Sequence, residues 1–141
     1  MLLIPTQLAI LVCTHLVPYY FEGVRVGVPE MQKRFNVNPR TLNPALRTLV
    51  HAGILNSRTG GLDRGYILAR DPKSISVYDI VHLIQGEPKV ECCVETHGCM
   101  NCEAVKCSNG YCKIFNRLNS VLEISRQEIG KISLYDQYYN K

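Results

Sequence analysis

The sequence lacks the features of an exported or membrane-anchored protein. Its N-terminal stretch, MLLIPTQLAILVCTHLVPYYF, has neither a basic leading region nor a small-residue cleavage site. The longest uninterrupted apolar run, Leu8–Cys13, is far too short to cross a bilayer. We therefore expect a cytoplasmic protein without a membrane anchor. Because the cytoplasm is reducing, clustered cysteines are expected to bind a metal or to act in redox chemistry rather than to form structural disulfides.

The sequence also lacks a catalytic constellation. His15, His51 and His82 are scattered, and we find no nucleophile placed to work with any of them. The spacing of Cys99 and Cys102 would suit a thiol–disulfide enzyme, but that motif normally opens a helix in a βαβ unit, and no βαβ pattern is present. We therefore expect a protein that is not an enzyme and has no small-molecule substrate, with the thiol–disulfide enzyme as a weaker alternative.

Acidic residues are nearly absent between Lys33 and Arg70. Seven basic residues in this segment are opposed only by Asp63. Residues 1–70 carry eight Lys and Arg against three Asp and Glu, whereas residues 71–141 carry eight against nine. The net charge of +4 is thus concentrated in the first half of the chain. A basic segment favours contact with a polyanion, while a solvated charged surface is the alternative that charge alone leaves open.

Apolar residues recur at regular spacing in short segments, which are separated by proline, asparagine and glycine. This pattern predicts a mainly helical fold with a small β-hairpin. The expected elements are helices over 5–16, 28–35 and 38–52, strands over 54–57 and 65–69, and a helix over 77–85. Two glycines in the segment 58–64 indicate a hairpin loop longer than a two-residue turn. This order of elements is that of a winged helix-turn-helix: helix, short helix, turn, helix and hairpin.

The third predicted helix has clear signals at both ends, but it also has a proline in its interior. Asn38 is a typical N-cap residue, Pro39 suits the first turn, and Gly53 favours a left-handed cap at the end. Pro44, however, lies inside the helix, where it removes one backbone hydrogen bond and crowds the carbonyl four residues back. The sequence leaves open whether the helix is kinked at Pro44 or starts only at Asn43.

This helix and the hairpin carry side chains suited to DNA. In a winged helix-turn-helix, the helix after the turn enters the major groove, and hairpin arginines reach the minor groove or the backbone. Arginine and asparagine at the N-terminal end of such a helix pair with guanine and adenine. We therefore predict seven residues that contact double-stranded DNA: Asn38, Arg40, Thr41, Asn43, Arg47, Arg58 and Arg64. A winged helix that binds another protein is the alternative, but it needs no basic third helix.

The last third of the sequence carries a heptad pattern. Its members, of which only Ser125 is polar, are Phe115, Leu118, Leu122, Ser125, Ile129 and Ile132. Val121 widens this stripe. A long helix of this kind pairs with a second copy or packs on its own domain. We favour a homodimer, because a two-fold protein matches a palindromic operator.

Three stretches resemble one known family. They are SISVYDIVHLIQGE, LRTLVHAGILNSR…RGYILARDP, and a cysteine-rich loop leading into a long helix that ends in ISLYD. They resemble the Rrf-type winged-helix transcriptional regulators, the family of the iron–sulfur cluster regulator IscR and the nitric-oxide-responsive repressor NsrR. The resemblance implies a dimeric repressor that senses redox, iron–sulfur or nitric-oxide status. We expect a DNA-binding domain over 1–86, a sensor loop over 87–112, and a dimerisation helix and tail over 113–141.

The sensor loop holds all but one of the seven cysteines. The resemblance implies an iron–sulfur cluster on Cys93, Cys99 and Cys112. Between Cys99 and Cys112 lie twelve residues, a longer gap than the family usually has. This inserted stretch contains Cys102 and Cys107. Cys92, which neighbours the first expected ligand, is expected to be dispensable, as is Cys13, which we expect to be a small buried hydrophobic residue.

The fourth ligand of the expected cluster differs from the family pattern. Phe115 stands where the family has a histidine, and Gln7 stands where it has an acidic residue. Because such clusters are usually held by four thiolates, we expect Cys102 or Cys107 as the substitute, with His97 a weaker candidate. The cluster type, 2Fe-2S or 4Fe-4S, stays open. We expect protein handled in air to lose the cofactor.

Two other uses of these cysteines remain open. Cys99 and Cys102 have the spacing of a zinc knuckle, and Cys107 with Cys112 would complete a four-sulfur zinc site. The third possibility is a thiol/disulfide switch without any cofactor.

Overall fold

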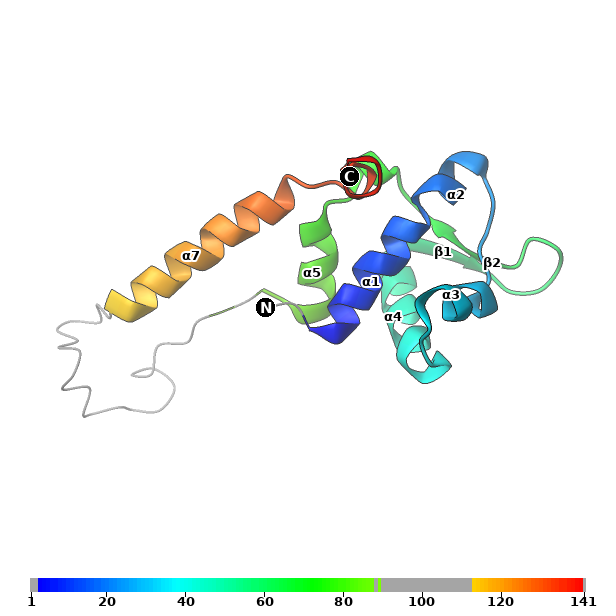
Figure 1. Ribbon diagram of the computed structural model, residues 1–141, viewed down its shortest axis with the longest axis horizontal. Helices are drawn as coiled ribbons and strands as arrows, with labels where there is room; N and C mark the ends of the chain where they lie inside the picture. Colours follow the sequence, from blue (N-terminus) through cyan, green and yellow to red (C-terminus); the bar gives the residue numbers. More distant parts are fainter. Residues whose placement is uncertain (1–2, 88, 90–112, 141) are drawn as a thin grey trace. The chain divides into compact units, whose positions relative to one another are not determined.

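A computed structural model describes residues 3–87, 89 and 113–140, and Figure 1 traces them along the chain. They fall into two compact units. The first contains Met1–Gly86 and Ile129–Lys141, and the second contains Glu87–Glu128. The fold is mainly helical with one two-stranded hairpin, which confirms the predicted fold class. The predicted three-part division of the chain stays a prediction.

Two consecutive helices open the first unit. α1 (Ile4–His15) is followed at once by α2 (Val17–Glu22). α1 agrees with the helix expected over 5–16, whereas α2 was not predicted. Pro18 lies in the first turn of α2, where a proline costs little because no N–H partner is required there. α1 packs against helices on several sides and has Val12 and Cys13 fully buried in the core.

The stretch formed by these two helices is apolar as well as long. Among the described residues, Ile4–Glu22 is the one stretch that could cross a membrane by length and composition, with a mean hydropathy of 1.2. Leu8, Val12 and Leu16 belong to the hydrophobic core of the unit. A buried core helix passes the same criterion, so the stretch is weak evidence for a membrane span.

The helix-turn-helix consists of α3 (Val28–Phe35) and α4 (Pro39–His51). α4 is one continuous helix from Pro39, so a delayed start at Asn43 is wrong. Pro44 and the residue four positions before it, Arg40, are both exposed, and water can satisfy the carbonyl that loses its partner.

α4 ends as the sequence predicts. Gly53 has a φ of +72°, which confirms the left-handed cap. Its N–H donates to the carbonyl of Val50 at 3.0 Å, and the N–H of Ile54 donates to the carbonyl of Leu49 at 3.0 Å. This pair of bonds is a Schellman motif, which satisfies two carbonyls at the end of the helix.

The hairpin follows directly and forms the wing. β1 (Leu55–Arg58) pairs antiparallel with β2 (Gly65–Leu68), with Leu55 opposite Leu68 and Arg58 opposite Gly65. Val26, just before α3, adds an isolated bridge to Tyr66, with two N–H to carbonyl bonds of 2.9 Å. A Cβ on Gly65 would lie 2.7 Å from the Val26 carbonyl oxygen, so this close approach requires glycine.

The C-terminal end of the chain closes the first unit. η1 (Pro72–Ser74) leads to α5 (Val77–Gln85), and α8 (Leu134–Tyr139) lies beside α1, α2 and η1. Ser76 and Ser133 each form a capping box, and the two residues also make an antiparallel bridge. Leu134 is fully buried, so the tail belongs to the core.

The long helix α7 (Lys113–Gly130) lies mostly in the second unit. Three of its apolar side chains are largely exposed: Leu118 at 46%, Val121 at 62% and Ile124 at 62%. Leu118 and Val121 belong to the predicted stripe, and Leu122 is half-buried. Ile124 lies outside the stripe. The helix therefore presents an apolar surface that the described residues of its own unit leave partly uncovered.

Candidate nucleic-acid interface

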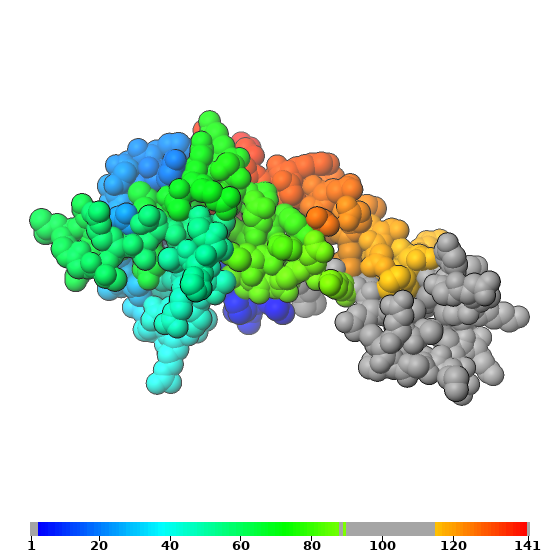
Figure 2. All heavy atoms as spheres, turned by 180° about the vertical axis from the view of Figure 1, so that it is seen from behind, coloured from blue at the N-terminus to red at the C-terminus, as the bar shows by residue number. Residues whose placement is uncertain are grey.

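α4 is sharply divided between a buried and an exposed face. Its buried residues, Leu42, Ala45, Leu46 and Leu49, recur at helical spacing and pack into the core. The seven predicted DNA contacts, on α4 and the wing, are all exposed: Asn38, Arg40, Thr41, Asn43, Arg47, Arg58 and Arg64. In Figure 2 the start of α4, in cyan, and the wing loop, in green, both project from the body of the unit.

The N-terminal end of α4 is fixed by Asn38. The side-chain oxygen of Asn38 accepts a hydrogen bond from the backbone N–H of Arg40 at 2.9 Å. This bond confirms the predicted cap and uses one of the two lone pairs of that oxygen. Asn38 is therefore placed to position the helix. The end of the helix carries partial positive charge, which favours a nearby phosphate.

The turn before α4 sets the angle of the helix. Asn36 adopts a left-handed conformation with a φ of +51°, which asparagine tolerates better than most residues. The N–H of Val37 donates to the carbonyl of Gln32 at 3.3 Å, and Met31 is fully buried below the turn. The turn is therefore held by local bonds and by the core, and α4 can be presented at a fixed angle.

The wing tip contains one paired and one unpaired arginine. Arg58 lies 3.6 Å from Asp63 across the loop, with exposed fractions of 60% and 80%. Such an exposed pair contributes little stability, about 0–1 kcal/mol, but it neutralises part of the charge. Arg64 makes no ion pair with any described residue, so it is the freer of the two arginines. Leu62 at the tip is fully exposed.

The sequence interpretation missed a residue that organises the base of the wing. The guanidinium of Arg25 donates to the backbone carbonyl of Asn56 at 3.1 Å, to its side-chain oxygen at 3.1 Å and to the carbonyl of Gly65 at 3.4 Å. These bonds tie the segment before α3 to both strands. Local sequence patterns could hardly reveal this role of Arg25, because the contact depends on the Val26–Tyr66 bridge, which joins distant segments of the chain.

The basic segment also contains two residues that are not among the predicted contacts. Lys33 and Arg34 stand in the last turn of α3 and are exposed.

The predicted metal ligands lie outside the described residues. They are Cys93, Cys99 and Cys112, with Cys102 or Cys107 as the fourth, and His97 and Cys92 lie outside as well. Within the described part of the chain, no group of three or more His, Cys, Asp or Glu side chains could hold a metal ion. Cys13 is buried, as expected, and burial raises the pKa of its thiol to about 12. A thiol so hard to ionise is a poor metal ligand.

A family model and several solved structures match the chain. The family model described as Rrf2, iron-dependent transcriptional regulator, matches residues 5–139. CymR of B. subtilis, the global cysteine regulator, has a TM-score of 0.78 and 15% identity, over 100% of this chain and 98% of that one. IscR of T. potens has a TM-score of 0.76 and 19% identity, over 99% of this chain and 87% of that one. CymR of Staphylococcus aureus has a TM-score of 0.70 and 16% identity, over 96% of this chain and 95% of that one.

At these identities the solved structures show that the fold is shared. No curated protein sequence matches the chain.

Proposed function

The chain belongs to the Rrf2 family of transcriptional regulators, and we propose that it is a cytoplasmic, homodimeric repressor that controls a palindromic operator through an iron–sulfur cluster. Membership of this family makes it a transcriptional regulator and not an enzyme, as expected from the sequence. The observation that carries the proposal is the capped, polar face of α4 beside the wing, in a chain that the family model covers from residue 5 to residue 139.

The proposed contacts to DNA divide by role. Arg40, Thr41 and Asn43 lie in the first turns of α4, where a recognition helix meets base edges. Arg47 lies further along the exposed face, where phosphate contacts are expected. Arg64, and Arg58 once it leaves Asp63, would reach the minor groove or the neighbouring backbone.

The proposed dimer rests on α7. Leu118 and Val121 are exposed apolar residues on one stripe of this helix, together with the half-buried Leu122. Pairing with the same helix of a second copy would remove this surface from water, which is the main favourable term in most protein association. A two-fold pair would then present two α4 helices to the two halves of a palindromic site.

The proposed cluster rests on the donor set of the cysteine-rich segment. Thiolates are the ligands that iron–sulfur clusters require, and the family is described as iron-dependent. We propose Cys93, Cys99 and Cys112 as ligands, with Cys102 or Cys107 as the fourth. A bound cluster would supply a group whose charge and ligation respond to oxidants, iron supply or nitric oxide. A zinc site is the second candidate, supported by the Cys99–Cys102 spacing, and a thiol/disulfide switch is the third.

The experiment that tests the cluster is an absorption spectrum with iron and sulfide analysis of protein purified without oxygen. We expect a brown protein containing both iron and sulfide. Cys93→Ser should lose most of this iron, whereas the neighbouring Cys92→Ser, a matched control, should retain it. Equal iron in both variants would contradict the ligand assignment. Stoichiometric zinc without sulfide, in protein made with ample iron, would replace the cluster by the zinc site.

A further inference from the structure

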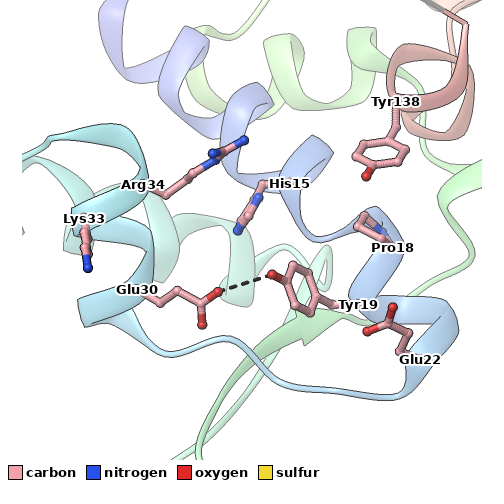
Figure 3. Close-up of a pocket in the computed structure, with 8 residues that line it drawn as sticks. All are labelled: His15, Pro18, Tyr19, Glu22, Glu30, Lys33, Arg34 and Tyr138. Atoms are coloured by element: carbon pink, nitrogen blue, oxygen red, sulfur yellow. Dashed lines mark hydrogen bonds between the residues drawn. The ribbon is translucent and has the colours of Figure 1, made fainter.

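A pocket of about 690 Å³ lies in the first unit beside α3, and none of its lining residues belongs to α4. Its walls come from α1, α2, α3 and α8, as Figure 3 shows. Its size falls in the range of small-molecule sites, roughly 300–1,000 Å³. The proposed DNA contacts and the proposed cluster ligands take no part in its lining.

Opposite charges stand on opposite walls of this pocket. Lys33 and Arg34 belong to α3, and Glu22 belongs to the end of α2, across the pocket in Figure 3. Within the described part of the chain, none of these three side chains forms an ion pair or a side-chain hydrogen bond. Glu30 differs, because its carboxylate accepts a hydrogen bond from the hydroxyl of Tyr19 at 3.2 Å. Two cationic groups and one carboxylate therefore remain available to a ligand.

The space between these charges is lined by rings. His15 packs edge-on against Tyr19, with ring centroids 5.3 Å apart, and Tyr138 and Pro18 lie along the wall formed by α8 and α2. The Nε2 atom of His15 is buried and has no hydrogen-bond partner among the described residues. Burial, together with the nearby Arg34, lowers the pKa of His15, so the ring is neutral at neutral pH. A buried polar atom without a partner is uncommon in folded proteins.

We propose that this pocket binds a small zwitterion whose carboxylate and ammonium groups are separated by several bonds. Its carboxylate would lie against Lys33 and Arg34, its ammonium group against Glu22, and the chain that joins them between Tyr19 and Tyr138. A simple anion would be repelled by the two glutamates, and a simple cation would be repelled by the two basic residues. A molecule with both charges fits both walls, because each charge then faces its opposite.

The position of the pocket gives binding a consequence that rests on the proposed function. α3 leads directly through the turn at Asn36 into α4, and Phe35 at its end packs edge-on against His15 at 5.5 Å. A ligand that links α2 to α3 would restrict the helix that precedes the DNA-reading helix. Occupancy of the pocket is therefore expected to change the affinity for DNA.

The test is titration calorimetry of the whole protein with a series of ω-amino acids of increasing chain length, with glycine as the shortest member. We expect at least one to bind saturably, and its amide, which lacks the carboxylate, to bind at least about ten-fold more weakly. Arg34→Gln and Glu22→Gln should each weaken binding by a similar factor. Arg70→Gln removes an exposed arginine that is not part of the pocket lining, and should leave binding unchanged.

The possible results separate clearly. Binding of none of the series, or equal binding by wild type, Arg34→Gln and Glu22→Gln, would overturn the proposal. Circular dichroism should show that both variants keep the wild-type fold, and Lys33→Gln provides a second variant if Arg34→Gln is unfolded. An amino acid that binds without changing the DNA affinity would remove the regulatory consequence and leave the binding site intact. Failure of DNA binding itself would affect only the proposed function.

Discussion

The side-chain oxygen of Asn38 accepts a hydrogen bond from the backbone N–H of Arg40 at 2.9 Å, and this bond defines where α4 begins. Asn38 and Arg40 are both exposed, so the cap lies at the end of α4 that is proposed to meet DNA. Asn38 thus fixes the start of the helix, and Arg40 is the residue that we propose to face the groove.

Removing this cap should therefore affect both stability and DNA binding. We expect Asn38→Ala to lower the free energy of unfolding by about 1 kcal/mol, because one N–H at the end of the helix loses its partner. Asn38→Ser keeps a capping oxygen and should remain close to wild type. Urea unfolding measures the effect. Equal destabilisation by alanine and serine would show that the cap is not what Asn38 contributes.

Arg40 and Arg47 should differ in what they contribute to binding. If Arg40 pairs with a guanine, Arg40→Ala should cost about 1–3 kcal/mol on the operator and less on random duplex. Arg47→Ala should weaken both alike and reduce the salt slope by about one unit, because a phosphate contact is lost. Arg117→Ala, an exposed arginine on α7, is the control. Fluorescence anisotropy over several salt concentrations gives all three values, and identical behaviour of Arg40→Ala and Arg117→Ala would exclude Arg40 from the interface.

The proposed dimer makes a prediction about two positions on α7. Leu122→Glu places a carboxylate on the apolar stripe, where burying it without a partner costs several kcal/mol, and it should produce a monomer. Ile124→Glu changes an exposed residue outside the stripe and should leave the dimer intact. Analytical ultracentrifugation separates the two outcomes. A dimer that survives Leu122→Glu would show that the stripe does not form the interface.

Several elements of this fold could be predicted because their signals are local. Asn38, Pro39 and Gly53 mark both ends of α4, and the two glycines of the wing loop mark the turn between the strands. The exposed face of α4 followed from the helical spacing of its leucines. α2 was not predicted, because a proline that follows one helix also suits the first turn of the next.

Other features could not be read from the sequence, because they join distant segments. The Val26–Tyr66 bridge connects residues forty positions apart, and the bonds from Arg25 to the wing depend on it. The pocket is likewise formed by four helices, one of them at the C-terminal end of the chain. No local pattern in His15 or Tyr138 reveals that the two line the same space.

The environment of His15 makes stability depend on pH. Burial and Arg34 lower its pKa below the usual 6.5, while Glu30 acts in the opposite direction. As the pH falls below 6.5, the unfolded chain therefore takes up a proton that the folded protein resists, and stability is lost until the pH passes below the folded pKa. Wild type should lose more stability than His15→Phe between about pH 7.5 and about pH 5 in urea unfolding. Equal losses would show that His15 does not cause the dependence.

The salt dependence of binding to a pool of mixed-sequence duplex DNA tests the central claim most directly. If the exposed arginines of α4 and the wing meet the phosphate backbone, the logarithm of the binding constant should fall linearly with the logarithm of the salt concentration. The slope should be about −0.9 for each phosphate contacted, and several contacts are expected from a dimer. Wild-type protein that shows no salt-dependent binding to any duplex, even at low salt, would contradict the account.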